Sequence, residues 1–131
     1  MIRFLLDAWP ARRRLAALVL FPVVATWLLV VGRSSEAVPS SGFWYAVVLV
    51  AALLGAAVLA SYLPVAGRGL DMGCTPCATF SALTLVGAST AMYKYGADIA
   101  GPLVASAVLL FGLTQRMNQP AMCETPVREG R

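Results

Sequence analysis

The chain of 131 residues contains no histidine and only six acidic residues, and none of these six lies within a long apolar run. Without an imidazole, zinc or haem sites built on histidine and histidine-based acid–base catalysis are excluded. The apolar runs also lack the buried carboxylate on which proton-coupled exporters depend. No Gly-rich phosphate loop is present. These absences exclude most enzyme classes, and we expect a protein that is not an enzyme.

Charge is scarce as well, and its placement points to a membrane. Charged residues make up 12% of the chain and hydrophobic residues 60%, with a mean hydropathy of +0.78. An ordinary soluble domain carries about twice that share of charge. The net charge of +4 comes from basic residues that flank apolar segments. The composition therefore predicts a lipid bilayer as the surroundings and gives no indication of nucleic-acid binding.

Four segments are long and apolar enough to be considered as membrane spans: 15–32, 43–63, 77–93 and 99–115. The first two carry no charge, whereas the last two are shorter and richer in Ser, Thr and Gly, which is typical of helices that face protein. The basic start of the first segment imitates a secretory signal, but its run is too long and Gly32 and Arg33 give a poor cleavage site. We predict an all-α integral membrane protein, one domain over 1–131, with four transmembrane helices in a compact bundle.

The basic residues of the turns predict the orientation of this bundle. Four spans place both termini and the turn 64–73 on one side, and that side holds eight of the ten basic residues: Arg3, Arg12, Arg13, Arg14, Arg68, Arg116, Arg128 and Arg131. The other side holds Arg33 and Lys94. The positive-inside rule then makes both termini cytoplasmic. The Arg-rich, Lys-poor usage indicates a bacterial protein, so we expect a multi-pass protein of the bacterial inner membrane.

Small and aromatic residues are placed where membrane helices use them. Small residues recur at four-residue spacing, which lets helix backbones approach closely: Ala52, Ala56 and Ala60, Ala51 and Gly55, Gly87 and Ala91, Thr84 and Ala88, and Gly101 and Ala105. Aromatic residues gather near segment ends, where their rings suit the lipid headgroup level: Trp27, Phe43, Trp44, Tyr45, Tyr62, Tyr93 and Tyr95. The small-residue faces serve either the bundle itself or a contact with a partner protein or a second copy.

The three cysteines are the candidate chemistry. Cys74 and Cys77 enclose Thr75-Pro76 at the start of the third segment, and Cys123 follows the fourth. The free N–H groups and positive dipole end of a helix start stabilise thiolates, and thiolates bind soft cations. The orientation places all three thiols on the cytoplasmic side, where they stay reduced. Packing is the alternative, because cysteine is also a good small apolar residue.

The same residues carry a family resemblance. Cys74-Thr75-Pro76-Cys77 opening one helix, a short turn at Lys94, and Cys123-Glu124 beyond the next helix resemble the helical hairpin of the bacterial mercury-transport membrane proteins, over roughly residues 73–126. The smallest members of that family have adjacent cysteines at both sites, whereas here Thr75-Pro76 splits the first pair and Glu124 follows Cys123. The resemblance implies that Hg(II) passes from Cys74 and Cys77 towards Cys123 and on to a cytoplasmic thiol.

Three functions therefore remain open. The first is a protein that binds or transports a soft metal ion, mercury or copper, through Cys74, Cys77 and Cys123. The second is an accessory structural subunit of a larger membrane complex, with no chemistry of its own. The third is a membrane thiol–disulfide oxidoreductase, against which the cytoplasmic placement and the lack of a second redox pair count. We take soft-metal binding as the leading hypothesis.

Overall fold

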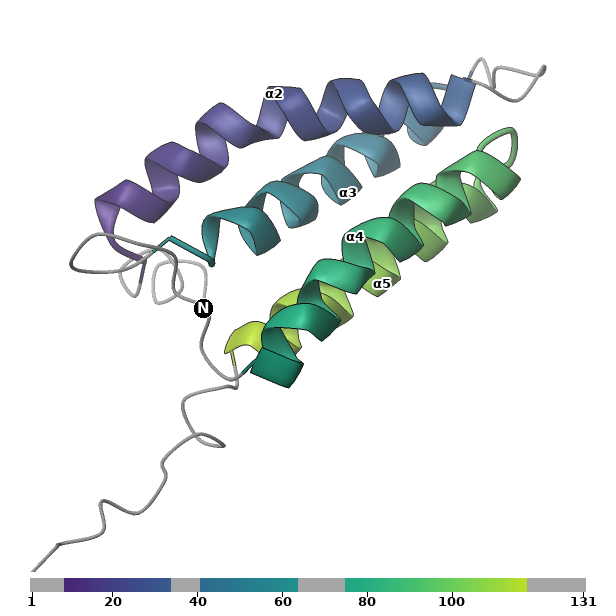
Figure 1. Ribbon diagram of the computed structural model, residues 1–131. Coiled ribbons are helices and arrows are strands. Elements are labelled where there is room, and N and C mark those ends of the chain that lie inside the picture. Colours follow the sequence, from purple (N-terminus) through teal and green to yellow (C-terminus); the bar gives the residue numbers. More distant parts are fainter. Residues whose placement is uncertain (1–8, 34–40, 64–74, 118–131) are drawn as a thin grey trace, which may run out of the picture.

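The computed structural model describes residues 9–33, 41–63 and 75–117, and for 75–78 it describes the backbone alone. These ranges fold into four helices and contain no strand: α2 (Ala11–Arg33), α3 (Gly42–Ala60), α4 (Thr75–Tyr95) and α5 (Ala100–Met117) (Figure 1). Each helix overlaps one of the four segments predicted from the sequence. The all-helical fold class is confirmed for the described part of the chain.

Three of the four helices are long and apolar enough to cross a membrane, namely α2, α3 and α5. This identifies a membrane protein. The fourth predicted span stays a prediction, because α4 is not among the helices that are apolar enough by length and composition. Its 21 residues include Ser81, Thr84, Ser89, Thr90 and Lys94, which lower its hydropathy.

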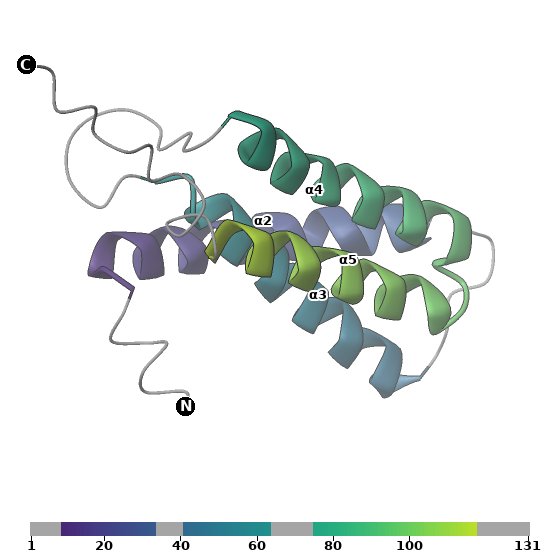
Figure 2. The same ribbon diagram turned by 90° about the horizontal axis from the view of Figure 1, so that it is seen from below.

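The helices associate as two antiparallel pairs, α2 with α3 and α4 with α5 (Figures 1 and 2). The two pairs pack mainly through α3 and α5, while α2 and α4 touch less. Trp27 in the second half of α2 donates from Nε1 to Ser89 Oγ of α4 at 3.2 Å. Figure 1 shows α2 and α4 approaching each other at one end of the molecule and separating towards the other.

Small residues of α3 form the centre of the core. The alanines predicted to line a packing face, Ala51, Ala52, Ala56 and Ala60, are all fully buried. At Gly55 an added Cβ would lie 3.0 Å from Cγ1 of Val24, so α2 crosses α3 where a side chain is missing. The helices approach closely here because α3 presents almost no side-chain volume, as expected for membrane helices that associate without a hydrophobic driving force.

The pair α4–α5 is held by a polar seam. Ser81 Oγ donates to the Gly112 carbonyl at 3.5 Å, and an added Cβ at Gly112 would collide with Oγ1 of Thr84. The preceding residue of each helix adds a ring contact, because Phe80 and Phe111 meet edge to face with centroids 6.0 Å apart. These contacts fix the register of the two helices, with Ser81 and Thr84 facing Gly112.

One end of the molecule is tightly packed around Trp44, Gly32, Met92 and Gly96, and we call it the Trp44 end. Trp44 is fully buried and donates from Nε1 to the Gly96 carbonyl at 2.9 Å. A Cβ on Gly96 would collide with the Met92 carbonyl and lie 2.9 Å from Gly32 Cα. The Trp44 ring, predicted to lie near a segment end, is inside the protein, where its N–H joins the two helix pairs.

Candidate functional site

The structure places the three predicted cysteines unequally. Cys77 falls in the first turn of α4, although its side chain lies outside the described atoms. Cys74 and Cys123 lie outside the described residues altogether. Within the described residues there is no group of three or more His, Cys, Asp or Glu side chains that would hold a metal ion. The grouping of Cys74, Cys77 and Cys123 into one site stays a prediction.

The start of α4 gives its cysteines a defined relation to the helix. Because α4 begins at Thr75, Cys77 is its third residue and Cys74 directly precedes it. The backbone N–H groups of a first helical turn have no partner within the helix, and the helix dipole makes this end positive. Pro76 fits the first turn because it brings no N–H that the helix would use.

The register of α4 against α5 shows which residue of α5 lies level with the first turn of α4. Ser81 faces Gly112, so one turn towards the start of α4 and one turn towards the end of α5 bring the backbone positions of Cys77 and Arg116 to the same level. Arg116 is buried, with 8% of its surface exposed. A buried guanidinium thus lies at the end of the helix pair where the cysteine pair begins.

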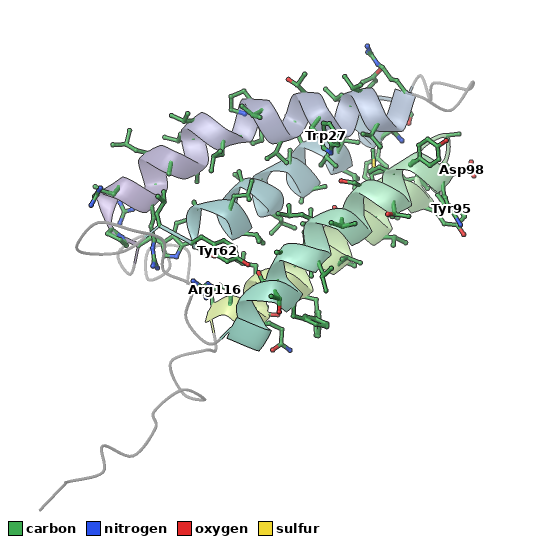
Figure 3. The ribbon with its side chains drawn as sticks, in the orientation of Figure 1. Trp27, Tyr62, Tyr95, Asp98 and Arg116 are labelled. Carbon is green, nitrogen blue, oxygen red and sulfur yellow. The ribbon has the colours of Figure 1, made fainter. Side chains whose placement is uncertain are left out.

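Arg116 belongs to a cluster of contacts that joins three helices, labelled in part in Figure 3. Its Cζ lies 4.7 Å from the centroid of the Tyr62 ring, which follows α3 directly. Arg13 of α2 donates from Nε to the carbonyl of Leu63 at 2.8 Å. We call this region, where α2 starts and α3 and α5 finish, the Arg116 end.

Charge is distributed unevenly between the two ends. Of the basic residues in the described ranges, Arg12, Arg13, Arg14 and Arg116 belong to the Arg116 end, and Arg33 and Lys94 to the Trp44 end. Asp98, in the turn between α4 and α5, is the one acidic residue in those ranges and also lies at the Trp44 end (Figure 3). The described part of the Arg116 end is therefore purely cationic and favours anionic groups.

The interior between the helix pairs does not extend the candidate site. A cavity of about 280 Å³ separates α2 from α4 and is lined by apolar side chains such as Leu59, Leu85 and Leu109, with Trp27 and Ser89 at its edge. Apart from that hydroxyl and the indole, its walls carry no polar side chain. This cavity therefore offers no ligands to a soft or charged ion.

Sequence reasoning missed the part of Arg116 in this region. The sequence indicates Arg116 only as a turn charge that sets orientation, yet its side chain is buried and lies over the ring of Tyr62 beyond the end of α3. The available signal was Tyr62 near the end of the second segment, since a tyrosine and an arginine at equal depth form a cation–π pair when their helices meet. The chain matches no protein-family model, no curated protein and no solved structure in the comparisons made.

Proposed function

We propose that the protein binds a soft metal ion, Hg(II) or Cu(I), through thiolates of Cys74, Cys77 and Cys123 at the Arg116 end. The observation that carries the proposal is the start of α4 at Thr75, which puts Cys77 in the first turn of a helix at the level of buried Arg116. Both the helix terminus and the guanidinium favour a thiolate over a thiol. Thiolate is the ligand that soft cations prefer.

The proposal includes four membrane spans, with α4 as the fourth. At 1.5 Å per residue α4 is about 32 Å long, which matches the hydrocarbon core of a bilayer. Its polar side chains are internally satisfied: the hydroxyls of Ser81, Thr84, Ser89 and Thr90 each donate to a backbone carbonyl. Hydroxyls bonded in this way cost little in lipid, so α4 crosses the membrane beside α5 despite its lower hydropathy.

The proposal also orients the protein in a bacterial inner membrane with the Arg116 end on the cytoplasmic side. The described charges, four basic residues against two basic and one acidic, support this orientation. A reporter that is active only in the cytoplasm should work when fused after Arg131 or inserted near Gly69, and should fail near Ser40. Activity near Ser40 with silence after Arg131 would reverse the orientation.

The test of metal binding is retention of Hg(II) or Cu(I) by the detergent-purified protein, measured by native mass spectrometry. We expect Cys74→Ser and Cys77→Ser each to abolish high-affinity retention, because a serine hydroxyl stays protonated and is a poor ligand for a soft cation. Met92→Leu is the matched control, since it removes a buried soft sulfur at the Trp44 end. Equal retention by the wild type and a Cys74→Ser, Cys77→Ser double variant would refute metal binding.

Cys123 is proposed as the ligand through which the metal leaves. Transfer proceeds by ligand exchange, in which one metal–sulfur bond forms as another breaks and no electrons are exchanged. Cys123→Ser should therefore leave binding at the pair largely intact and slow the passage of Hg(II) to glutathione, measured by stopped flow in the same lipid. Identical rates for variant and wild type would remove Cys123 from the proposal.

A second candidate, an accessory subunit without chemistry, is favoured by the outer face of α4. This face presents Thr79, Leu83, Val86, Gly87 and Thr90 to the surroundings, yet α4 is not among the helices apolar enough to cross a membrane. A helix of this kind gains stability from covering by protein. Co-purification of a stoichiometric membrane partner, together with absence of bound metal in the same mass spectrum, would favour the subunit over the metal binder.

A further inference from the structure

A groove on the far side of the α2–α3 pair has the features of a lipid site. Its volume is about 610 Å³, and its walls include Ala17 and Phe21 of α2 and Leu49 and Leu53 of α3. This volume is in the range of small-molecule pockets. The walls are apolar along their length, and the groove lies apart from the start of α4, where the cysteine pair is found.

Among the described residues that line the groove, one is charged. Arg14 lines the groove in the first turns of α2, next to Trp9. Its Nε donates to the Trp9 carbonyl at 2.8 Å, which holds the side chain in place and leaves its terminal amino groups without a hydrogen bond to any described residue. Arg14 is exposed. An anionic group beside Arg14 would therefore face a positive charge, and an acyl chain attached to it would contact the apolar side chains of the groove.

The depth of the groove matches one leaflet of a membrane. Arg13 bonds to the Leu63 carbonyl and so marks the level of the opening on α3. Leu53 and Leu49 lie about 10.5 and 16.5 Å along the helix axis from Ala60, the last residue of α3, at 1.5 Å per residue. Half of the hydrocarbon core is about 15 Å thick. An acyl chain that starts at the opening would reach the end of the groove.

We propose that the groove holds one acyl chain of an anionic phospholipid, whose phosphate is bound by Arg14. Trp9 is half-buried beside the phosphate level, where an indole ring is favoured. Basic pockets between membrane helices select anionic headgroups because juxtamembrane arginines attract them. The bound lipid fills the space between α2 and α3 that their own side chains leave open, and it fixes the start of α2 at the membrane surface.

The experiment is competition between two lipids in mixed micelles, read by native mass spectrometry of the full-length protein. Phosphatidylglycerol and phosphatidylcholine with identical acyl chains are supplied in equal amounts. We expect the wild type to retain one phosphatidylglycerol in about fivefold preference, the effect of one arginine near the surface. Arg14→Gln should bring the ratio to about one. Arg33→Gln, at the other end of α2, should leave the ratio unchanged.

Two further measurements separate a lipid from other occupants. Ala17→Phe, which narrows the groove behind Arg14, should reduce retention of both lipids, with helicity by circular dichroism as the check on folding. Millimolar glycerophosphate, which has the headgroup without the chains, should not displace the lipid. Equal retention of both lipids by the wild type, equal loss of preference in Arg14→Gln and Arg33→Gln, displacement by glycerophosphate, or a lipid-free dimer would each overturn the proposal.

Discussion

The two ends of the bundle differ in how their helices are held together. At the Trp44 end, glycines bring backbones together around a buried indole, and an added methyl group at Gly96 has no room. At the Arg116 end, α2 and α4 separate, and the joints are made by long cationic side chains, Arg13 to a carbonyl and Arg116 to a ring (Figure 3). One end is closed by small residues and the other by large ones.

This difference indicates that the two ends contribute differently to stability. Close-packed backbones cannot move without losing contacts, so the Trp44 end anchors the two helix pairs to each other. Arginine and tyrosine side chains reach several ångströms from their helices and carry charge or a hydroxyl at their tips. The Arg116 end can therefore receive an anionic group or a thiolate-bound metal while the Trp44 end holds the fold.

The largest effect is expected from Gly96→Ala. The added Cβ would meet the Met92 carbonyl and the backbone of Gly32, which cannot yield as a flexible side chain can. We expect a loss of about 3 kcal/mol in the free energy of unfolding, measured by thermal unfolding in detergent. Gly42→Ala, with open space around the new methyl group, should change it by less than about 0.5 kcal/mol. Similar losses for both variants would mean that the Trp44 end is not the anchor.

The next largest effect is expected from Trp44→Phe, and Trp27→Phe serves as the comparison. Trp44→Phe leaves the buried Gly96 carbonyl without its donor, and we expect a loss of about 2 kcal/mol. Trp27 is 59% exposed and bonds to Ser89 at 3.2 Å, so Trp27→Phe should cost no more than about 0.5 kcal/mol. The same unfolding measurement compares them. A larger loss for Trp27→Phe would place the joint between the helix pairs at α2–α4 instead.

The sequence predicts the helices better than the contacts between them. Apolar runs and small-residue spacing were sufficient to foresee four helices and the buried face of Ala52, Ala56 and Ala60. Hydropathy averages could not foresee the burial of Trp44, because whether an end-of-helix ring turns to lipid or to protein depends on which helix lies opposite. The same reason hid the contact of Arg116 with Tyr62.

The sequence predicts which residues belong to the candidate site, but it does not predict how they are arranged in space. The sequence predicts Cys74 and Cys77 at a helix start because Pro76 suits a first turn, and α4 does begin at Thr75. The level of Arg116 relative to that turn follows only from the register of α4 against α5, which depends on Gly112 making room for Thr84. Such a register is a tertiary property that spacing within one helix does not encode.

A third prediction tests whether the charge at the Arg116 end acts on the thiols. Arg116→Gln removes a buried positive charge at the level of Cys77, so thiolate formation should be less favoured. We expect alkylation of the cysteines at pH 7 to slow about three- to tenfold, measured by mass spectrometry over time. Arg116→Lys keeps the charge and should preserve most of the rate, and Arg33→Gln should not change it. Equal slowing by Arg116→Lys and Arg116→Gln would show that Arg116 acts through packing instead.

The smallest effect concerns Gly87, which lies on the exposed face of α4. Its added Cβ would meet only Cγ1 of Val108, at an ordinary contact distance of 3.5 Å. Gly87→Ala should therefore raise the stability of the isolated chain by about 0.5 to 1 kcal/mol, because alanine favours a helix over glycine. Gly112→Ala on the facing helix, where the methyl group would collide with Thr84, should lower it.

The same substitution separates the two candidate functions. If α4 faces lipid, Gly87→Ala changes only the free energy of unfolding. The number of chains that stay associated in mild detergent, read from the native mass, is then the same as for the wild type. If a partner helix packs on α4, the glycine is where its backbone comes closest, and a methyl group there weakens the complex. Loss of a co-purifying partner or of a dimer from Gly87→Ala, in a chain that is itself more stable, would establish α4 as an interface. An unchanged mass with intact metal retention would leave the cysteines at the Arg116 end as the functional part of the molecule.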